Sequence, residues 1–103
     1  MTSAATQTGL RPSDVVHARR AEIRAIVRDH GVNNPRIIGS VARGTDTPSS
    51  DLDLLVTVPS GAALGFLCLA ESLSTYLGIK VDVVSDKGLQ RSHQYIIDEA
   101  VPL

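Results

Sequence analysis

Two aspartates separated by one residue, Asp51 and Asp53, stand at the start of the aliphatic run SDLDLLV. Side chains alternate along a β-strand, so both carboxylates would share one face while Leu52 and Leu54 take the other. Like charges held that close repel each other. The arrangement therefore requires water or a cation beside the pair, although a solvated strand edge also accounts for such a pair when it is taken alone.

A third carboxylate, Asp82, lies in the run VDVVS, between valines that point to the opposite side of the strand. On a strand next to the first, Asp82 would join Asp51 and Asp53. Three converging carboxylates are too costly to remain ionised unaided, and a hard divalent cation resolves the conflict. Mg²⁺ takes one or two carboxylates together with substrate phosphates. We therefore predict a magnesium site, with one ion or two, at these three aspartates.

The other half of the expected site is the pair Gly39-Ser40, which follows a short aliphatic run. After a strand, a glycine lets the backbone approach a ligand closely, and N–H groups at a helix start favour an anion. The Ser40 hydroxyl adds a donor, and Arg43 can reach a phosphate oxygen or hold the loop in place. Together with the carboxylates, these residues predict metal-assisted phosphoryl or nucleotidyl transfer, in which positioning and charge neutralisation dominate catalysis.

The elements that must position these residues alternate between helix and strand patterns. The predicted order is α-β-β-α-β-α, an α/β domain with a small mixed β-sheet flanked by helices. Ser13 or Asp14 is expected to cap the first helix, which ends at Gly31. The other expected ranges are strands at 36–38, 51–58 and 80–85 and helices at 62–77 and 89–100. Residues 1–11 read as a flexible tail, and 12–103 as one domain.

Composition limits the classes of function. A chain of 103 residues with a net charge of −1 has no global field that attracts nucleic acid or a membrane surface. Aromatic residues make up 3 %, too few for base-stacking platforms, so we expect no direct DNA binding. No secretion signal and no membrane-spanning run is visible, which favours a cytoplasmic protein. The single cysteine, Cys68, is expected to be a buried structural thiol.

The middle helix is unusually apolar, because Glu71 is its only charged residue. One stripe is expected to face the core: Ala63, Phe66, Ala70, Leu73 and Leu77. Further apolar groups, Leu64, Leu67 and Leu69 among them, occupy much of the remaining surface. A small domain rarely buries a helix on all sides, so an exposed apolar patch would indicate an interface. Burial by the other helices is the alternative.

Other polar residues are assigned to structure. The arginines of the first helix are expected to form a solvated face: Arg19, Arg20, Arg24 and Arg28. Asp46 is expected to shape a turn, and Asp86 to cap a helix or remain solvated. Tyr76 and Tyr95 are expected to be half-buried helix residues.

The segment GSVARGTDTPSSDLDLLV, residues 39–56, resembles the signature of minimal nucleotidyltransferases of the DNA polymerase β superfamily. That signature is G-S, about ten residues, then D-x-D. The resemblance extends over residues 32–103, through VDVVS and IIDEAVPL. It implies the nucleotidyltransferase fold, and it implies roles for individual residues: Gly39 and Ser40 grip a nucleoside triphosphate, Asp51 and Asp53 hold Mg²⁺, and Asp82 ligates metal and acts as base towards an acceptor hydroxyl.

Many members of this group are antitoxins encoded beside a HEPN-domain toxin, a helical ribonuclease. The resemblance therefore implies transfer of AMP from ATP to a tyrosine of such a toxin, within a hetero-oligomer. One alternative is an antitoxin that blocks the toxin by binding alone. A weaker alternative is nucleotidyl transfer to a small molecule or an RNA end. The scarcity of aromatic residues disfavours it, and no appended domain that would recognise a small acceptor is visible in the sequence.

Overall fold

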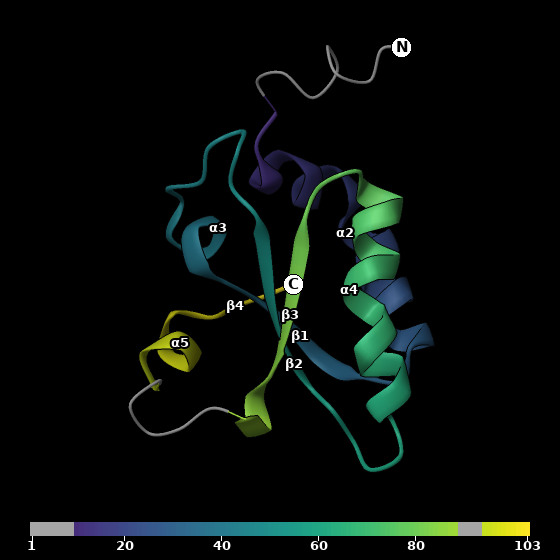
Figure 1. The fold of residues 1–103 in the computed structure, drawn as a ribbon. Coiled ribbons are helices and arrows are strands. Elements are labelled where there is room, and N and C mark those ends of the chain that lie inside the picture. The colour runs from purple at the N-terminus through teal and green to yellow at the C-terminus, as the bar shows by residue number, and fades with distance from the viewer. Residues whose placement is uncertain (1–9, 89–93) are drawn as a thin grey trace.

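The computed structural model describes residues 10–88 and 94–103. Its elements in chain order are α2 (Pro12–Asp29), β1 (Asn33–Ile38), α3 (Gly39–Arg43), β2 (Leu52–Thr57), α4 (Ala63–Leu77), β3 (Val81–Ser85), the 3₁₀ turn η1 (Asp86–Gly88), α5 (Gln94–Glu99) and β4 (Val101–Pro102) (Figure 1). The strands form one sheet in the order β3-β2-β1-β4. Strands β2 and β3 are parallel, whereas β1 is antiparallel to both of its neighbours. The predicted α/β class with a small mixed sheet is confirmed.

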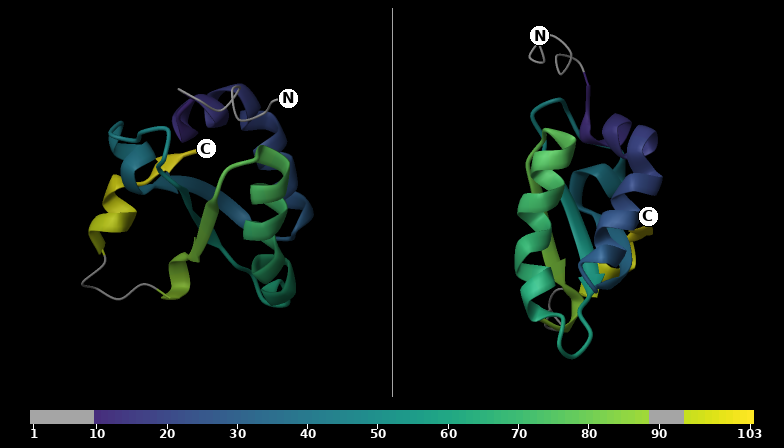
Figure 2. Two further views of the ribbon diagram at one scale, coloured as in Figure 1. Left: turned by 45° about the horizontal axis from the view of Figure 1, so that its top comes forward. Right: turned by 90° about the vertical axis from the view of Figure 1, so that its right-hand side faces the viewer.

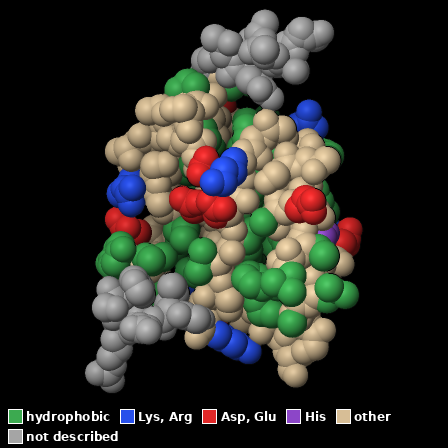
Figure 3. All heavy atoms as spheres, in the orientation of Figure 1, with side chains coloured by type: hydrophobic (Ala, Val, Ile, Leu, Met, Phe, Trp, Pro, Cys, Tyr) green, Lys and Arg blue, Asp and Glu red, His purple; other side chains and the backbone are tan. Residues whose placement is uncertain are grey.

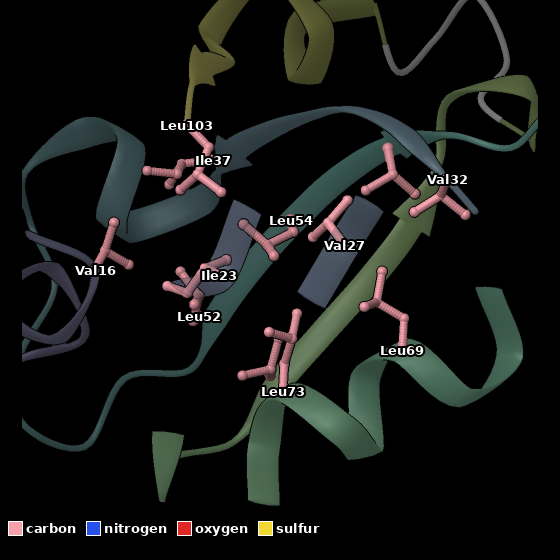
Figure 4. Packing of buried hydrophobic residues seen from close by; sticks show 12 residues of the cluster. Val16, Ile23, Val27, Val32, Ile37, Leu52, Leu54, Leu69, Leu73 and Leu103 are labelled. Carbon is pink, nitrogen blue, oxygen red and sulfur yellow. The ribbon is translucent and has the colours of Figure 1, made fainter. Parts of the chain in front are cut away.

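Helices α2 and α4 lie on one side of the sheet, and α3 and α5 lie on the other (Figures 1 and 2). The main hydrophobic core fills the space between the sheet and helices α2 and α4 (Figure 4). Its fully buried members include Ile23, Leu52, Leu54, Val56, Leu69 and Leu73. Because side chains alternate along a strand, Asp53, which lies between Leu52 and Leu54, points away from this core, towards α3.

Strand β2 is buried on both faces along part of its length. Leu55 is fully buried although it shares a face with Asp53. It lies in the centre of the sheet, where β1 pairs with it on one side and β3 on the other. The carboxylate face is therefore only partly open to water, and a charge placed on it is poorly solvated.

Helix α4 has the predicted core stripe at Phe66, Leu73 and Leu77 and the expected exposed apolar patch, with differences at Ala63, which is exposed, and at Leu69 and Cys68. Leu69 and Leu73 are buried, whereas Leu64 and Leu67 are each 74 % exposed. Cys68 is exposed as well, so the prediction of a buried thiol is wrong. The physical reason is the close approach of α4 to the end of α2 at Gly65, where an added Cβ would collide with the carbonyl oxygen of His30. That contact turns the opposite side of α4 towards solvent.

The ends of several elements also differ from expectation. Helix α2 begins at Pro12 with Arg11 as its N-cap, so the prediction of Ser13 or Asp14 as the cap is wrong. Instead, Asp14 lies in the first turn and accepts a hydrogen bond from the Arg11 backbone N–H at 2.9 Å. The short strand β4, which pairs with β1, was not predicted. Residues 1–9 of the expected tail, which was predicted to span 1–11, and the start of the last helix at 89–93 lie outside the described residues.

None of the helices in the described ranges has both the length and the apolar character needed to span a bilayer.

Candidate active site

The central feature of the candidate site is the pairing of Asp53 with Asp82. The two residues are register partners on the parallel strands β2 and β3. Neighbouring strands in a sheet lie about 4.8 Å apart, so the two side chains leave the sheet next to each other. Figure 3 shows acidic side chains gathered near the middle of this face, with basic side chains beside them. The sequence-based expectation that Asp82 would stand beside the D-x-D pair is met in the register.

The electrostatics of Asp53 reflect this crowding. Burial raises the pKa of the Asp53 carboxyl, and the charges of Asp82 and Asp51 raise it further. The positive charges of Lys80 and Arg43 act in the opposite direction without cancelling the rise. A carboxyl whose pKa is raised by both desolvation and like charges, on an accessible face, is typical of a functional site.

Asp51 lies at the edge of this cluster, where it contacts a lysine. Its Oδ2 is 3.6 Å from Nζ of Lys80, with both side chains partly exposed. The backbone holds the pair in place, because the Leu52 N–H donates to the Lys80 carbonyl at 3.0 Å. Lys80 was not recognised in the sequence, although it precedes Asp82 by two residues and therefore shares its face.

The three aspartates do not form a ready metal cage. Over residues 10–88 and 94–103, no three His, Cys, Asp or Glu side chains are gathered so as to hold an ion. The donor set nevertheless fits Mg²⁺, because this ion prefers oxygen ligands and takes only one or two carboxylates beside phosphate oxygens and water. Asp53 and Asp82 supply that minimum in register, and Asp51 joins them if its carboxylate turns from Lys80.

Gly39 brings the backbone unusually close to Asp53. Its φ is +73°, and a Cβ on it would lie 2.7 Å from Oδ2 of Asp53. Glycine is therefore required twice, for the left-handed backbone and for the space beside the carboxylate. Gly39 also begins α3, so backbone N–H groups that lack helical acceptors stand next to the carboxylates. This arrangement can hold a phosphate beside a metal ion.

Ser40 and Arg43 complete the residues predicted for nucleotide binding, and both belong to α3. The Ser40 carbonyl accepts a hydrogen bond from the Thr45 N–H at 2.9 Å, which closes the turn after the helix. Arg43 is exposed, and its Nη1 lies 3.6 Å from Oε1 of Glu99 on α5. The structure thus brings Gly39, Asp53 and Asp82 together, with Asp51 at their edge, whereas the Arg43 side chain pairs with α5.

The prediction that Asp46, in the loop before β2, only shapes a turn is wrong. Asp46 is only 5 % exposed, and its Oδ2 accepts a hydrogen bond from the Ser13 N–H at 2.8 Å, so it is an anchor rather than a simple turn former. Burial alone would raise the pKa of Asp46, but the Ser13 hydrogen bonds and the charge of Arg11 lower it overall. The anchor ties the loop that leads to Asp51 onto the first turn of α2.

A second tie holds the far ends of the central strands. Asp86 accepts hydrogen bonds from Oγ1 of Thr57 at 2.6 Å and from Nη2 of Arg36 at 2.9 Å. Burial raises the pKa of Asp86, but these two partners lower it overall. The expectation that Asp86 is a cap or a solvated group is therefore wrong, since its carboxylate joins the end of β3 to β1 and β2.

Comparison with known proteins gives consistent results. Residues 20–101 match the family described as nucleotidyltransferase domain. A protein of Methanocaldococcus jannaschii, assigned by its name as a protein adenylyltransferase, is 32 % identical over 84 residues, covering 71 % of this chain and 84 % of that protein. A solved structure assigned as a minimal nucleotidyltransferase has a TM-score of 0.78 at 39 % identity, over 88 % of this chain and 95 % of the other. A toxin–antitoxin structure with AMP-PNP shares the fold at 22 % identity, with a TM-score of 0.67 over 80 % of this chain and 69 % of the other.

Proposed function

The chain belongs to the nucleotidyltransferase domain family, and we propose that it transfers AMP from ATP to a hydroxyl of a partner protein in a Mg²⁺-dependent reaction. One observation carries the proposal: the backbone at Gly39 approaches Asp53 closely, beside its register partner Asp82. A phosphate held at Gly39 would be next to a carboxylate pair whose charges repel. That is the geometry in which positioning and charge neutralisation can drive phosphoryl chemistry.

The roles of the residues in this proposal are those that the resemblance to minimal nucleotidyltransferases implies. Gly39 and Ser40 hold the triphosphate, with Arg43 as a further cationic contact. Asp51 and Asp53 hold Mg²⁺, and Asp82 contributes to the metal site and accepts the proton of the acceptor hydroxyl. Mg²⁺, when bound, neutralises the charge on the phosphates. The acceptor oxygen forms a bond to the α-phosphorus, the bond to the β-phosphate breaks, and pyrophosphate leaves with the electron pair.

The partner in this proposal is a HEPN-type ribonuclease toxin, and the acceptor is one of its tyrosines. Two observations support a toxin partner. A solved toxin–antitoxin pair named MntA-HpeT has the same fold, with a TM-score of 0.66 at 23 % identity over 82 % of this chain and 70 % of the other. Leu64 and Leu67 are also strongly exposed on α4, as expected of a surface that a partner covers. The protein then acts in the cytoplasm as the antitoxin of a hetero-oligomer, without direct DNA binding or membrane association.

A second candidate is an antitoxin that neutralises the toxin by binding alone. The exposed leucines favour it, because an apolar surface supplies affinity whether or not chemistry follows. The two candidates differ in what the carboxylate face must do. Only the catalytic reading requires that Ser40 and Asp51 be intact.

A double variant tests the proposal. Ser40→Ala, Asp51→Asn should still bind the co-expressed toxin, because neither residue lies near Leu64 or Leu67 in sequence, but should no longer neutralise it. Mass spectrometry should find AMP on a toxin tyrosine with the wild type and none with the variant. The control is Asp98→Asn, which changes an exposed aspartate of α5, on the other side of the sheet from α4 (Figure 2), and should behave as the wild type. If the site variant protects cells fully, neutralisation by binding alone is correct.

A further inference from the structure

Lys80 and Asp51 form an ion pair at the edge of the carboxylate face. Asp51 directly precedes β2 and Lys80 directly precedes β3, and the register of these two parallel strands brings the two residues opposite each other. The next pair of residues on the same side is Asp53 and Asp82, because side chains alternate along a strand. At about 3.3 Å per residue, the ion pair lies roughly 7 Å along the sheet from the paired aspartates.

The ammonium of Lys80 acts on both carboxylates of the D-x-D pair. Its Nζ lies 3.6 Å from Oδ2 of Asp51. At Asp53, burial and the neighbouring carboxylates raise the pKa, whereas the charge of Lys80 opposes the rise more strongly than that of Arg43 does. A lysine that the sequence did not single out therefore supplies much of the positive charge that the cluster experiences.

The backbone of Lys80 is fixed, whereas its side chain is exposed. The Lys80 carbonyl accepts a hydrogen bond from the Leu52 N–H at 3.0 Å, which ties its backbone to β2 whatever the side chain does. The side chain is 68 % exposed, and lysine carries a compact charge on a flexible four-carbon stem. An exposed ion pair contributes little to stability, so the ammonium can exchange the Asp51 carboxylate for another anion at small cost.

We propose that Lys80 is a positioning residue that takes the place of the metal ion at Asp51 and turns to the nucleotide when the ion binds. The inference rests on the proposed function. In the metal-free protein the ammonium compensates the carboxylate cluster and holds the Asp51 side chain beside it. Two cations cannot share one carboxylate without repelling each other, so an ion that binds Asp51 displaces the ammonium. Lysine binds phosphate as a point charge, and the displaced group then contacts the triphosphate held at Gly39.

Two ligands, each measured without the other, test this role. Lys80→Met removes the charge and keeps an unbranched stem. The variant should bind Mn²⁺ alone about threefold more tightly than the wild type, since the competing cation is gone, and a non-hydrolysable ATP analogue in EDTA about threefold more weakly. Electron paramagnetic resonance measures the free Mn²⁺, and NMR titration measures the analogue. A lysine that only supported the fold would weaken both ligands together, and that result overturns the inference.

Two further variants are matched to this one. Lys80 and Lys87 are the two lysines of the chain, and Lys87 lies in η1, beyond the far end of β3. Lys87→Met removes the same charge and stem there and should change neither affinity, whereas Lys80→Arg keeps the charge and should retain most of both. If Lys87→Met has the same effects as Lys80→Met, net charge explains them and the inference is wrong.

The displacement itself can be observed in the wild type. Lysine labelled with ¹³C at Cε gives one side-chain signal for each of the two lysines, and Lys80→Met assigns them. Mg²⁺ should shift the Lys80 signal, the ATP analogue with Mg²⁺ should shift it further, and the Lys87 signal should not move. An unchanged Lys80 signal while the Asp53 amide signal responds to Mg²⁺ overturns the inference and leaves the proposed function standing. If neither ligand shifts the signals of Gly39, Asp53 or Lys80, the proposed function fails and the inference fails with it.

Discussion

The carboxylate of Asp53 occupies the space into which a side chain on residue 39 would project. An ideal Cβ on Gly39 would meet Oδ2 of Asp53 at 2.7 Å, a separation that real Cβ atoms essentially never show. The glycine and the carboxylate are therefore packed as one structural unit, since any side chain at residue 39 would displace Asp53 or the start of α3. Their contact joins the phosphate-binding half of the candidate site to the metal-binding half.

Gly39→Ala should abolish nucleotide transfer, because the added methyl group must displace Asp53 or the start of α3. Gly44→Ala is a matched control, since Gly44 has φ +75° but nothing within 4 Å of its Cβ position. Both variants should lose about 1 kcal/mol of unfolding free energy to backbone strain, as alanine resists the left-handed region. Urea denaturation measures the loss of unfolding free energy caused by backbone strain, and nucleotide affinity measures the effect of each variant on the binding site. Similar nucleotide affinity in the two variants would contradict a role for the Gly39–Asp53 contact.

Asp53→Asn should abolish transfer and leave the stability of the nucleotide-free protein level or higher. Burial and the charges of Asp82 and Asp51 raise the pKa of Asp53, so its ionised form opposes folding. The wild type should therefore lose stability as the pH rises through the raised pKa, and the variant should not. Thermal unfolding at several pH values checks this, with Asp29→Asn on the exposed end of α2 as control. A variant that unfolds would make Asp53 a structural group.

Asp46→Asn should lower the free energy of unfolding by about 1 kcal/mol at neutral pH, because hydrogen bonds to charged groups are stronger than those to neutral ones. The folded pKa of Asp46 is lowered, so its contribution is complete above the unfolded value of about 3.9 and disappears as the pH falls through the folded value. Urea denaturation between neutral and acidic pH should show the difference between wild type and variant shrinking only in acid. A difference that is constant down to the lowest pH would assign it to packing.

Much of the candidate site follows from the sequence because strand alternation is a strong constraint. The aliphatic residues of β2 and β3 must face the core, and once the two strands are parallel neighbours, Asp53 and Asp82 fall into register. The close backbone approach at Gly39 was predictable from its position, since this glycine follows directly after a buried strand.

The remaining features depend on tertiary contacts that no local pattern encodes. Asp46 is buried because Ser13, 33 residues earlier in the chain, meets it across the fold. The exposure of Cys68 could not be derived, because α4 is apolar on most of its surface and its orientation depends on the contact of Gly65 with His30. Strand β4 spans only Val101 and Pro102, which is too short for a periodic signal.

ATP with Mg²⁺ should raise the melting temperature, because a ligand that binds only the native state stabilises it by about 2.7 kcal/mol at one hundred times its dissociation constant. Removal of the metal with EDTA should abolish most of this shift, since the uncompensated negative charges of Asp53 and Asp82 would repel the anionic phosphates. Asp82→Asn should show a reduced shift because it removes a ligand of the proposed metal site. Equal shifts with and without metal would remove the magnesium site from the proposal.

The exposed leucines of α4 should carry affinity for the partner and little of the fold. Leu64 and Leu67 are each 74 % exposed, so Leu64→Ser, Leu67→Ser should change the free energy of unfolding by less than about 1 kcal/mol. Affinity for the co-expressed toxin should fall at least about tenfold, because an apolar anchor buried in an interface contributes more than 1 kcal/mol. Nucleotide affinity should not change, which separates this surface from the carboxylate face. Tyr95→Ser, at a residue 57 % exposed on α5, is the control for loss of an exposed apolar group elsewhere. Calorimetric titration of the purified toxin gives the affinities, and an unchanged value for the leucine variant would place the toxin contact on another surface.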